Sequence, residues 1–327
     1  MHHQKILITG SSGFIGRRLM SYLKTHGYQI LGIDMMPPKI ELDGTPFKPC
    51  NILDAHALTR IMNDFKPDTV VHLAARTDLN EKTELRGYAV NIDGTYNLIN
   101  SIKEIGCAKR LLYTSSQLVC KVGYIPQNEV DYCPNTLYGE SKVCGERIIR
   151  DYDGGGVEWC ILRPTTIWGE GMSAHYQRFF RMIHLGRYIH IGNSPLYKSY
   201  GYVMNSVYQY RKFIEAPMEK VHRKTFYIAD YEPLSLRKWA DALAEKMDAK
   251  RIKTCPESIA RFVGGIGSII NSLGFSEFPF NTFRVNNILT QYTFDLSETE
   301  KVCGPLPFTF EEGVTRTVNW LKEEGIL

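Results

Sequence analysis

A glycine-rich turn between a short apolar run and a helical pattern constrains this chain more than any other feature. Residues 5–9 read Lys-Ile-Leu-Ile-Thr, which is typical of a buried parallel strand, and helical spacing begins at residue 17. Between them, Gly10 permits a tight turn, Gly13 lets the backbone approach a pyrophosphate, and Gly16 lets helix and strand pack closely. The N-terminus of such a helix offers free N–H groups to phosphates. The segment therefore predicts a strand–turn–helix unit that binds a dinucleotide.

A second apolar run, residues 29–33, ends in an acid, Asp34. A carboxylate at this place can hold the 2′- and 3′-hydroxyls of a ribose, and it would repel a 2′-phosphate. Met35 and Met36 follow and provide no arginine for such a phosphate. We therefore expect the cofactor to be NAD rather than NADP.

Tyr138 and Lys142 stand four residues apart in the segment Leu-Tyr-Gly-Glu-Ser-Lys, a spacing that puts both on one face of a helix. A phenol is a poor base near neutral pH, but a neighbouring ammonium favours the phenolate and lowers its pKa. Such a pair can exchange a proton with an alcohol hydroxyl while a cofactor handles the hydride. By itself the spacing is equally typical of a solvated helix face.

Five further segments, together with the glycine turn, Asp34 and the Tyr–Lys pair, resemble the extended short-chain dehydrogenase/reductase family. This family includes nucleotide-sugar epimerases and dehydratases, and the resemblance covers most of the chain. The five segments are Asn51-Ile52-Leu53-Asp54, His72-Leu73-Ala74-Ala75, Asn91-Ile92-Asp93-Gly94-Thr95, Arg110-Leu111-Leu112-Tyr113-Thr114-Ser115-Ser116 and Ile161-Leu162-Arg163-Pro164.

The resemblance implies an α/β fold, with a Rossmann-type doubly wound parallel sheet and a smaller, discontinuous α/β substrate lobe. It also implies the functional residues. Asn51 stands where the family has an acid, although its amide oxygen can still accept from the adenine amino group. The implied catalytic residues are Ser116, Tyr138 and Lys142. The implied cofactor contacts are Gly10, Ser12, Gly13, Phe14, Ile15, Gly16, Asp34, Asn51, Ile52, Leu73, Ala74, Ala75, Asn91, Thr114, Tyr138, Lys142 and Pro164. The implied substrate contacts are Thr77, Ser116, Thr166, His175, Lys198 and Arg284.

Departures from the family pattern bear on the reaction. Dehydratases have an Asp-Glu pair after the catalytic Ser or Thr, whereas Gln117 and Leu118 follow Ser116 here. Leu118 also stands where GDP-fucose-synthase-like enzymes have a cysteine base, and we interpret Cys120 as a packing thiol. His175 could act as a second acid, but a structural or substrate-contacting role fits a lone histidine better. The remaining residues resemble those of UDP-sugar 4-epimerases, so we expect C4 epimerisation of a nucleotide sugar.

Other reactions stay open at this point. The family's Asn after the sixth strand appears as Thr166, and Lys198 replaces an arginine as the diphosphate contact without its bidentate geometry. These changes leave room for a nucleotide-sugar reductase or dehydrogenase, and for a 3β-hydroxysteroid-dehydrogenase-like enzyme. Some relatives are non-enzymatic NAD-binding regulators that have lost the Tyr–Lys pair, which this chain keeps.

Composition narrows the setting. Of 327 residues, 23% are charged and 43% hydrophobic, which is ordinary for a globular protein, and a net charge of +4 is too small to indicate nucleic acid. The eight cysteines include no C-x-x-C pair, so we expect free thiols, a reducing cytoplasmic setting and no metal site. The N-terminal apolar run is the first strand rather than a signal peptide.

The pattern of elements suggests two domains. Residues 1–168 alternate strand and helix and predict the NAD-binding domain, to which a strand near 223–230 returns; residues 169–327 predict the substrate-binding lobe. The apolar stretch 259–270 is interrupted by Arg261 and is too short for a span, so we interpret it as a core helix or lid, with peripheral membrane contact as the alternative. The resemblance further implies a homodimer, formed by the helices that follow Asn91 and Tyr138, with no integral membrane segment.

Overall fold

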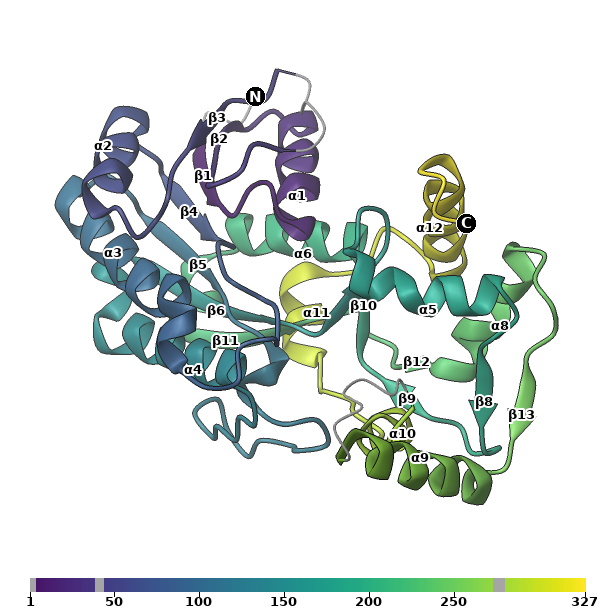
Figure 1. The fold of residues 1–327 in the computed structure, drawn as a ribbon. Coiled ribbons are helices and arrows are strands. Elements are labelled where there is room, and N and C mark those ends of the chain that lie inside the picture. The colour runs from purple at the N-terminus through teal and green to yellow at the C-terminus, as the bar shows by residue number, and fades with distance from the viewer. Residues whose placement is uncertain (1–3, 39–43, 273–279) are drawn as a thin grey trace. The chain divides into compact units, whose positions relative to one another are not determined.

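The computed structural model describes residues 4–38, 44–272 and 280–327 and divides the chain into two compact units (Figure 1). Each unit is assembled from three separate stretches of sequence. The first unit comprises Met1–Ile167, Gly201–Tyr231 and Phe294–Phe308, and the second comprises Trp168–Tyr200, Glu232–Thr293 and Thr309–Leu327.

A parallel sheet forms the centre of the first unit. In the described ranges it has seven strands in the order β11-β6-β5-β4-β1-β2-β3. The strand order reverses between β1 and β4, and open α/β sheets bind ligands at the carboxyl ends of the strands beside such a switch point. The predicted Rossmann-type sheet is confirmed. Its strands are β1 (Lys5–Thr9), β2 (Gln29–Asp34), β3 (Phe47–Pro49), β4 (Thr69–His72), β5 (Arg110–Thr114), β6 (Glu158–Pro164) and β11 (Lys224–Ile228).

Each face of this sheet has its own core, because successive strand residues point to opposite faces. Ile6 and Ile8 pack with helices α1, α6 and α11, whereas Leu7 packs with α2, α3 and α4. Burial on both faces explains why the strands read as continuous apolar runs. The helices are α1 (Phe14–Thr25), α6 (Val203–Glu215) and α11 (Ser297–Cys303) on one face, and α2 (Ala55–Phe65), α3 (Ala89–Ile105) and α4 (Leu137–Asp151) on the other, with the shorter η1 (Leu85–Tyr88), η2 (Gln117–Val119), η3 (Asp153–Gly155) and α7 (Met218–Val221).

The second unit is organised around Trp239. Its ring centroid lies 4.9 to 5.7 Å from those of Trp168, Phe179, Phe180 and Tyr200. Two small sheets pair β9 with β12 and β8 with β13. Its elements are α5 (Ala174–His184), β8 (Ile189–Ile191), β9 (Tyr197–Lys198), β12 (Leu234–Ser235), α8 (Leu236–Lys246), β13 (Lys253–Cys255), α9 (Glu257–Ser272), α10 (Thr282–Leu289) and α12 (Phe310–Glu323); a further small sheet of β7 (Thr166–Trp168) and β10 (Tyr200–Tyr202) has most of its residues in the first unit.

The stretch 259–270 lies in α9, and its interpretation as a core helix is wrong. Phe262 is 71% exposed and Ile269 61%. The residues of α9 that are buried are small, namely Ala260, Gly264 and Gly267, so the large apolar side chains are left outside. None of the helices in the described ranges combines the length and apolar character needed to cross a bilayer.

Two apolar residues of α4, one of the two helices in the predicted dimer contact, lie in the chain's own core. Val143 is 4% exposed and Ile149 is fully buried, so neither is available to a second copy. Tyr96 of α3 and Tyr152 at the end of α4 do remain on the surface, 41% and 39% exposed, with ring centroids 5.3 Å apart. The homodimer stays a prediction.

The eight cysteines are free, as expected.

Candidate active site

The glycine turn after β1 brings two neighbouring strand ends into direct contact. Gly10 has a φ of +70°, and a Cβ atom added there would lie 2.5 Å from the Ala74 amide nitrogen. A Cβ atom at Gly16 would likewise collide with the Gly10 carbonyl oxygen. A residue with a side chain would be strained at Gly10 and would clash at both positions. The predicted turn therefore has a steric basis in the fold.

The first turn of α1 is open to an anion. Gly13 is the N-cap, and in the described structure no side chain caps this helix and no acidic residue lies in its first turn. The first N–H groups of a helix, here those of Phe14 and Ile15, have no intrahelical acceptor, and the helix dipole favours negative charge beside them. This arrangement fits the diphosphate of a dinucleotide.

Asp34 ends β2 beside this turn. Its carboxylate accepts hydrogen bonds from the backbone N–H of Ser12 at 3.1 Å and of Met36 at 3.3 Å. The Ser12 hydroxyl donates to the Met36 carbonyl oxygen at 2.7 Å. These contacts hold the carboxylate at the edge of the glycine turn, where an adenosine ribose would follow the diphosphate.

The predicted adenine segment is held by α3. The Asn97 side chain donates to the carbonyl oxygens of Ile52 and Leu53 at 3.0 and 3.1 Å. Gly94 leaves room for Ile52, because a Cβ atom at Gly94 would lie 2.5 Å from its Cδ1. Asn51 is exposed, and its Oδ1 accepts from the Leu53 N–H at 3.0 Å. The segments 51–54 and 91–95, which the sequence analysis treats separately, thus pack against each other. Asn97, whose side chain joins them, was not predicted from the sequence.

His72, at the end of β4, is a structural residue. Its Nδ1 lies 2.7 Å from Thr9 Oγ1 and its Nε2 lies 3.3 Å from Thr95 Oγ1. Burial, assisted by the charge of Lys142, lowers the pKa of His72 to about 3, so the imidazole is neutral at neutral pH. Thr9 Oγ1 also accepts from the Ala74 N–H at 3.1 Å. The network fixes the loop that carries Leu73, Ala74 and Ala75.

Asn91 joins that loop to α4. Its Oδ1 accepts from the Arg76 N–H at 2.8 Å, and its Nδ2 donates to the Arg76 carbonyl oxygen at 3.0 Å and to Ser141 Oγ at 2.9 Å. Asn91 is 1% exposed. Its predicted cofactor contact remains a prediction, since the described contacts of its amide are all within the protein.

Tyr138 and Lys142 lie on one face of α4, as predicted, and that face is buried. The Thr136 hydroxyl accepts from the Gly139 N–H at 3.0 Å and so begins the helix just before the pair. Tyr138 is 7% exposed and Lys142 4%. Lys142 Nζ donates to the Thr114 carbonyl oxygen at 2.8 Å, which brings it to the carboxyl end of β5. The alternative of a solvated helix face is therefore excluded.

The buried position changes the acid–base properties of Lys142. Burial lowers its pKa to about 8, and the charge of Glu146, one turn further along α4, opposes that shift. An ammonium group has three N–H donors, and Thr114 accounts for one of them. The side chain thus combines a cation beside Tyr138 with donors suited to a ribose.

Ser116 lies just after the carboxyl end of β5, and the packing of α4 against η2 sets its position. A Cβ atom at Gly139 would collide with the Leu118 carbonyl oxygen, so the first turn of α4 lies directly on η2. Ser116 is the N-cap of η2, and its Oγ accepts from the Leu118 N–H at 3.1 Å. Because that bond uses a lone pair, the hydroxyl hydrogen of Ser116 can be donated elsewhere.

A buried ion pair behind α4 was missed from the sequence. Arg163 and Glu146 side chains are 1% and 0% exposed, with Nε–Oε1 and Nη2–Oε2 distances of 2.8 and 2.7 Å. Tyr132 also donates to Glu146 at 2.9 Å. Burial by itself lowers the pKa of Arg163, but the hydrogen bonds and charge of Glu146 raise it overall. The pair anchors the helix that carries Tyr138 and Lys142 to β6. The sequence signal that could have revealed the pair is Arg163 itself, because a charged residue inside the apolar strand β6 needs a buried partner.

The remaining first-unit predictions lie at the ends of β4 and β6. Pro164 is the last residue of β6, and Thr166 Oγ1 accepts from the Gln117 side chain at 3.3 Å. Thr166 is therefore tied to the residue next to Ser116. Thr77 follows β4 and is exposed.

Three predicted substrate contacts lie in the second unit. Lys198 Nζ donates to the Asn287 carbonyl oxygen of α10 at 2.6 Å, and burial lowers the pKa of Lys198 to about 8. Arg284 is exposed and stands one turn before Asn287 on the same helix. His175 is exposed in the first turn of α5. The structure thus associates Lys198 with the helix that carries Arg284, whereas His175 belongs to another element.

Residues 6–229 match the family model described as "NAD dependent epimerase/dehydratase family". The chain belongs to this family of enzymes. NAD is accordingly the cofactor of this epimerase/dehydratase family member, and the open first turn of α1, the Asp34 carboxylate and the spare donors of Lys142 fit its diphosphate and two riboses.

Relatives of this epimerase/dehydratase family member include enzymes of two kinds. A 3-beta-hydroxysteroid dehydrogenase of Mycolicibacterium neoaurum is 27% identical over 263 residues, 72% of this chain and 68% of the relative. The N-acetyl-alpha-D-glucosaminyl-diphospho-ditrans,octacis-undecaprenol 4-epimerase of Escherichia coli O157:H7 is 24% identical over 326 residues, 97% and 95% of the two chains. The solved UDP-glucose 4-epimerase of Thermotoga maritima with UDP-glucose is 20% identical, with a TM-score of 0.74 and coverage of 98% and 99%.

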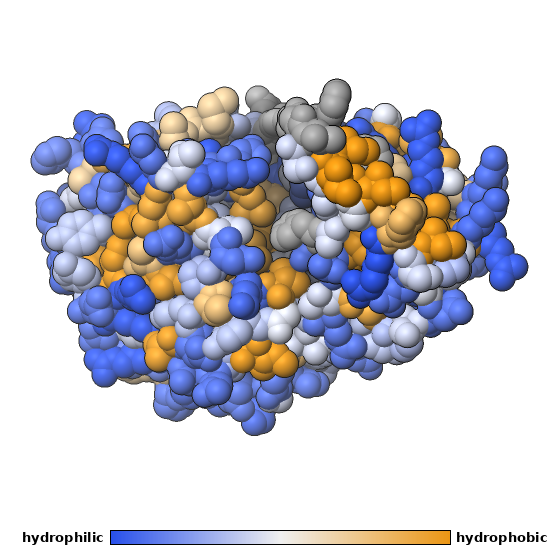
Figure 2. All heavy atoms as spheres, turned by 60° about the horizontal axis from the view of Figure 1, so that its bottom comes forward, coloured by the Kyte–Doolittle hydropathy of each residue, from blue (hydrophilic) through white to orange (hydrophobic). Residues whose placement is uncertain are grey.

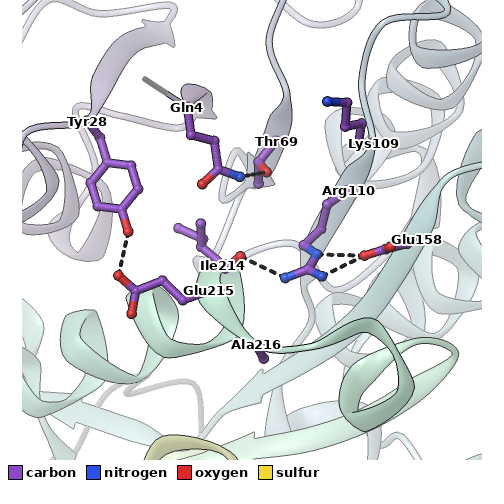
Figure 3. Close-up of a pocket in the computed structure, with 9 residues that line it drawn as sticks. All are labelled: Gln4, Tyr28, Thr69, Lys109, Arg110, Glu158, Ile214, Glu215 and Ala216. Atoms are coloured by element: carbon purple, nitrogen blue, oxygen red, sulfur yellow. Dashed lines mark hydrogen bonds and ion pairs between the residues drawn. The ribbon is translucent and has the colours of Figure 1, made fainter. Parts of the chain in front are cut away.

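A pocket at the amino-terminal edge of the sheet is separate from this site (Figure 3). Arg110 donates to Glu158 at 2.6 Å and to the carbonyl oxygens of Phe213 and Ile214 at 3.1 and 2.7 Å. Figure 3 shows two more such pairs, Tyr28 with Glu215 and Gln4 with Thr69. These polar groups pair with one another, so the pocket is a structural network that holds the strand ends.

Proposed function

We propose that this protein is an NAD-dependent 4-epimerase of a nucleotide sugar, UDP-linked or similar. One observation carries the proposal. Lys142 donates to the Thr114 carbonyl oxygen at the carboxyl end of β5, and the first turn of α4, which carries Tyr138, lies on η2, which Ser116 caps. Gln117 and Leu118 stand where a dehydratase needs an acid and a base. The group of Ser116, Tyr138 and Lys142 suffices for reversible oxidation at one carbon, but it lacks the residues that would expel water.

The chain's own residues would handle the proton. Tyr138, held toward phenolate by Lys142, would take the proton of the C4 hydroxyl and later return it. Ser116 would donate its free hydrogen to the same oxygen, since its lone pair already accepts from Leu118. NAD, when bound, supplies the hydride acceptor and donor. The keto sugar would turn over between the two transfers, so that hydride returns to the opposite face.

The sugar carrier would be recognised through its diphosphate. Lys198 is half-buried, and the single described partner of its ammonium group is one backbone carbonyl oxygen, that of Asn287, which leaves N–H donors for an anion. Arg284 is exposed on the helix that accepts from Lys198. The Escherichia coli relative is named for a sugar carried on a diphosphate, which supports this class of substrate.

A second candidate is net oxidation or reduction of a hydroxyl group. The Mycolicibacterium neoaurum relative is named as a 3-beta-hydroxysteroid dehydrogenase, and the same three residues would serve that chemistry. The two candidates differ in their use of cofactor. An epimerase regenerates its cofactor within each turnover, whereas a dehydrogenase must exchange it.

Turnover without added cofactor tests the proposal. The purified enzyme should carry NAD and convert UDP-glucose or UDP-N-acetylglucosamine to the C4 epimer, followed by proton NMR of the sugar. If NAD⁺ or NADH is consumed in proportion to product, the epimerase proposal is wrong and the dehydrogenase or reductase candidate takes its place.

Two tyrosine variants assign the acid–base role. Tyr138→Phe should lower turnover by roughly 10²-fold or more, while the NAD content of the enzyme stays unchanged. Tyr88→Phe is the matched control, because its ring centroid lies 6.1 Å from that of Tyr138 and its hydroxyl donates to the Asp78 carbonyl oxygen. Retention of more than about a tenth of the activity by Tyr138→Phe would assign the base to another group.

A further inference from the structure

Helix α9 turns a continuous apolar face to the outside. Its exposed large side chains are spaced three or four residues apart, which places them along one side of the helix. Figure 2 shows hydrophobic side chains gathered right of centre, in the region of α9. The members of this α9 face are Ile259, Phe262, Val263, Ile266 and Ile269, between 38% and 71% exposed.

The inner side of α9 explains why this face is not turned inward. A Cβ atom at Gly264 would lie 2.9 Å from Cγ2 of Val285 in α10, so the two helices are in close contact there. Ser268 Oγ donates to the Gly264 carbonyl oxygen at 3.1 Å and accepts from the Thr282 N–H at 3.0 Å. Small and polar residues thus complete the packing within the unit. An ordinary surface helix buries its large apolar residues, and α9 does the opposite.

Positive charge accompanies the α9 face. Between residues 250 and 272 the chain has four cations and one carboxylate. Lys250, Arg251 and Lys253 are exposed immediately before the helix. The carboxylate of Glu257 is paired with Arg261 at 2.8 Å. The net positive charge of residues 250–272 therefore comes from the three cations that precede the helix. An exposed apolar helix face that follows a run of exposed cations in the chain is suited to a surface that is apolar inside and anionic outside.

We propose that the α9 face docks this protein onto the surface of an anionic lipid bilayer. Sixteen residues are too few to span the hydrocarbon core, so the helix would lie in the interface with its apolar face inserted. A second copy of the chain is a poorer occupant, because a twofold contact would bring the same cations together. Docking goes beyond the proposed reaction and does not depend on it.

Vesicle binding tests the docking. The full-length protein should co-sediment with vesicles of phosphatidylglycerol and phosphatidylcholine and much less with phosphatidylcholine alone. The double variant Phe262→Ser, Ile266→Ser should lower partitioning at least about tenfold, because it removes apolar area from the face. Raising the ionic strength from about 0.1 M to about 1 M should also weaken binding, since the Debye length falls to roughly 3 Å.

The control is an exposed isoleucine elsewhere. Ile125 is 76% exposed in the first unit, so Ile125→Ser should bind vesicles like the unaltered protein. Equal vesicle binding by the double variant, or no binding by the unaltered protein, would overturn the proposal. The proposal would also be overturned if light scattering showed that the unaltered protein is a dimer and the double variant a monomer, because a second copy of the chain would then cover the α9 face. Circular dichroism and turnover of a soluble UDP-sugar should match the unaltered protein, so loss of docking and failure of the epimerase proposal are separable.

Discussion

Replacing Lys142 with methionine should change how the stability of the protein depends on pH. The pKa of Lys142 is lowered by burial to about 8 in the folded chain, from an ordinary value of 10.5. As the pH rises through 8, the folded state releases this proton while the unfolded state keeps it. The unfolded state then binds more protons, so the free energy of unfolding rises with pH until the unfolded lysine is also neutral. The variant lacks this contribution.

The magnitude follows from the two pKa values. Between pH 7 and pH 9.5 the unaltered protein should gain about 2 kcal/mol of unfolding free energy relative to Lys142→Met. Below about pH 7 both states are protonated and the difference should be flat. Taking the difference between the two proteins at each pH cancels the other titrating groups they share.

Urea denaturation followed by circular dichroism, at closely spaced pH values, measures this difference. Lys109→Met is the matched control, because the Lys109 side chain is 79% exposed and the same substitution there should give a pH-independent difference. A flat difference for Lys142→Met, or one that falls as the pH rises, would refute the reasoning that burial destabilises the ammonium. In the enzyme the same deprotonation should weaken turnover above pH 8, because Tyr138 loses its neighbouring cation.

Three further outcomes are expected. Asp34→Ala should narrow the preference for NAD over NADP by about 1.5–3 kcal/mol, measured by calorimetric titration of both cofactors, and equal affinities in the unaltered protein would contradict the assigned role. Glu146→Leu should destabilise the fold by about 3–5 kcal/mol in thermal unfolding because it leaves Arg163 as an unpaired buried charge, and the double replacement Glu146→Leu, Arg163→Met should recover most of that loss. Light scattering at micromolar concentration should report a homodimer, and a monomer would rule out the predicted contact of α3 and α4.

Much of the first unit could be predicted because its signals are local. The turn at Gly10 needs a left-handed backbone, and the face shared by Tyr138 and Lys142 follows from helix geometry. Apolar strand runs likewise predict a sheet covered on both faces. The place of Asp34 beside the glycine turn could be predicted because it is set by the strand that Asp34 ends, whereas its contact with a ribose stays a prediction.

The missed features all depend on residues far apart in the sequence. Arg163 and Glu146 are 17 positions apart, and nothing local indicates that they form a pair. The contacts of Asn91 join the loop after β4 to α4, which no spacing rule connects.

By itself, the sequence determined the order of the elements, the glycine turn, the acid at the end of the second strand and the Tyr–Lys helix face. Only the tertiary structure decided that Lys142 is buried with a lowered pKa and that α9 leaves its apolar face outside. The physical reason is the same in both cases. Backbone conformation and helix periodicity are properties of neighbouring residues, whereas desolvation depends on which distant segments cover a side chain.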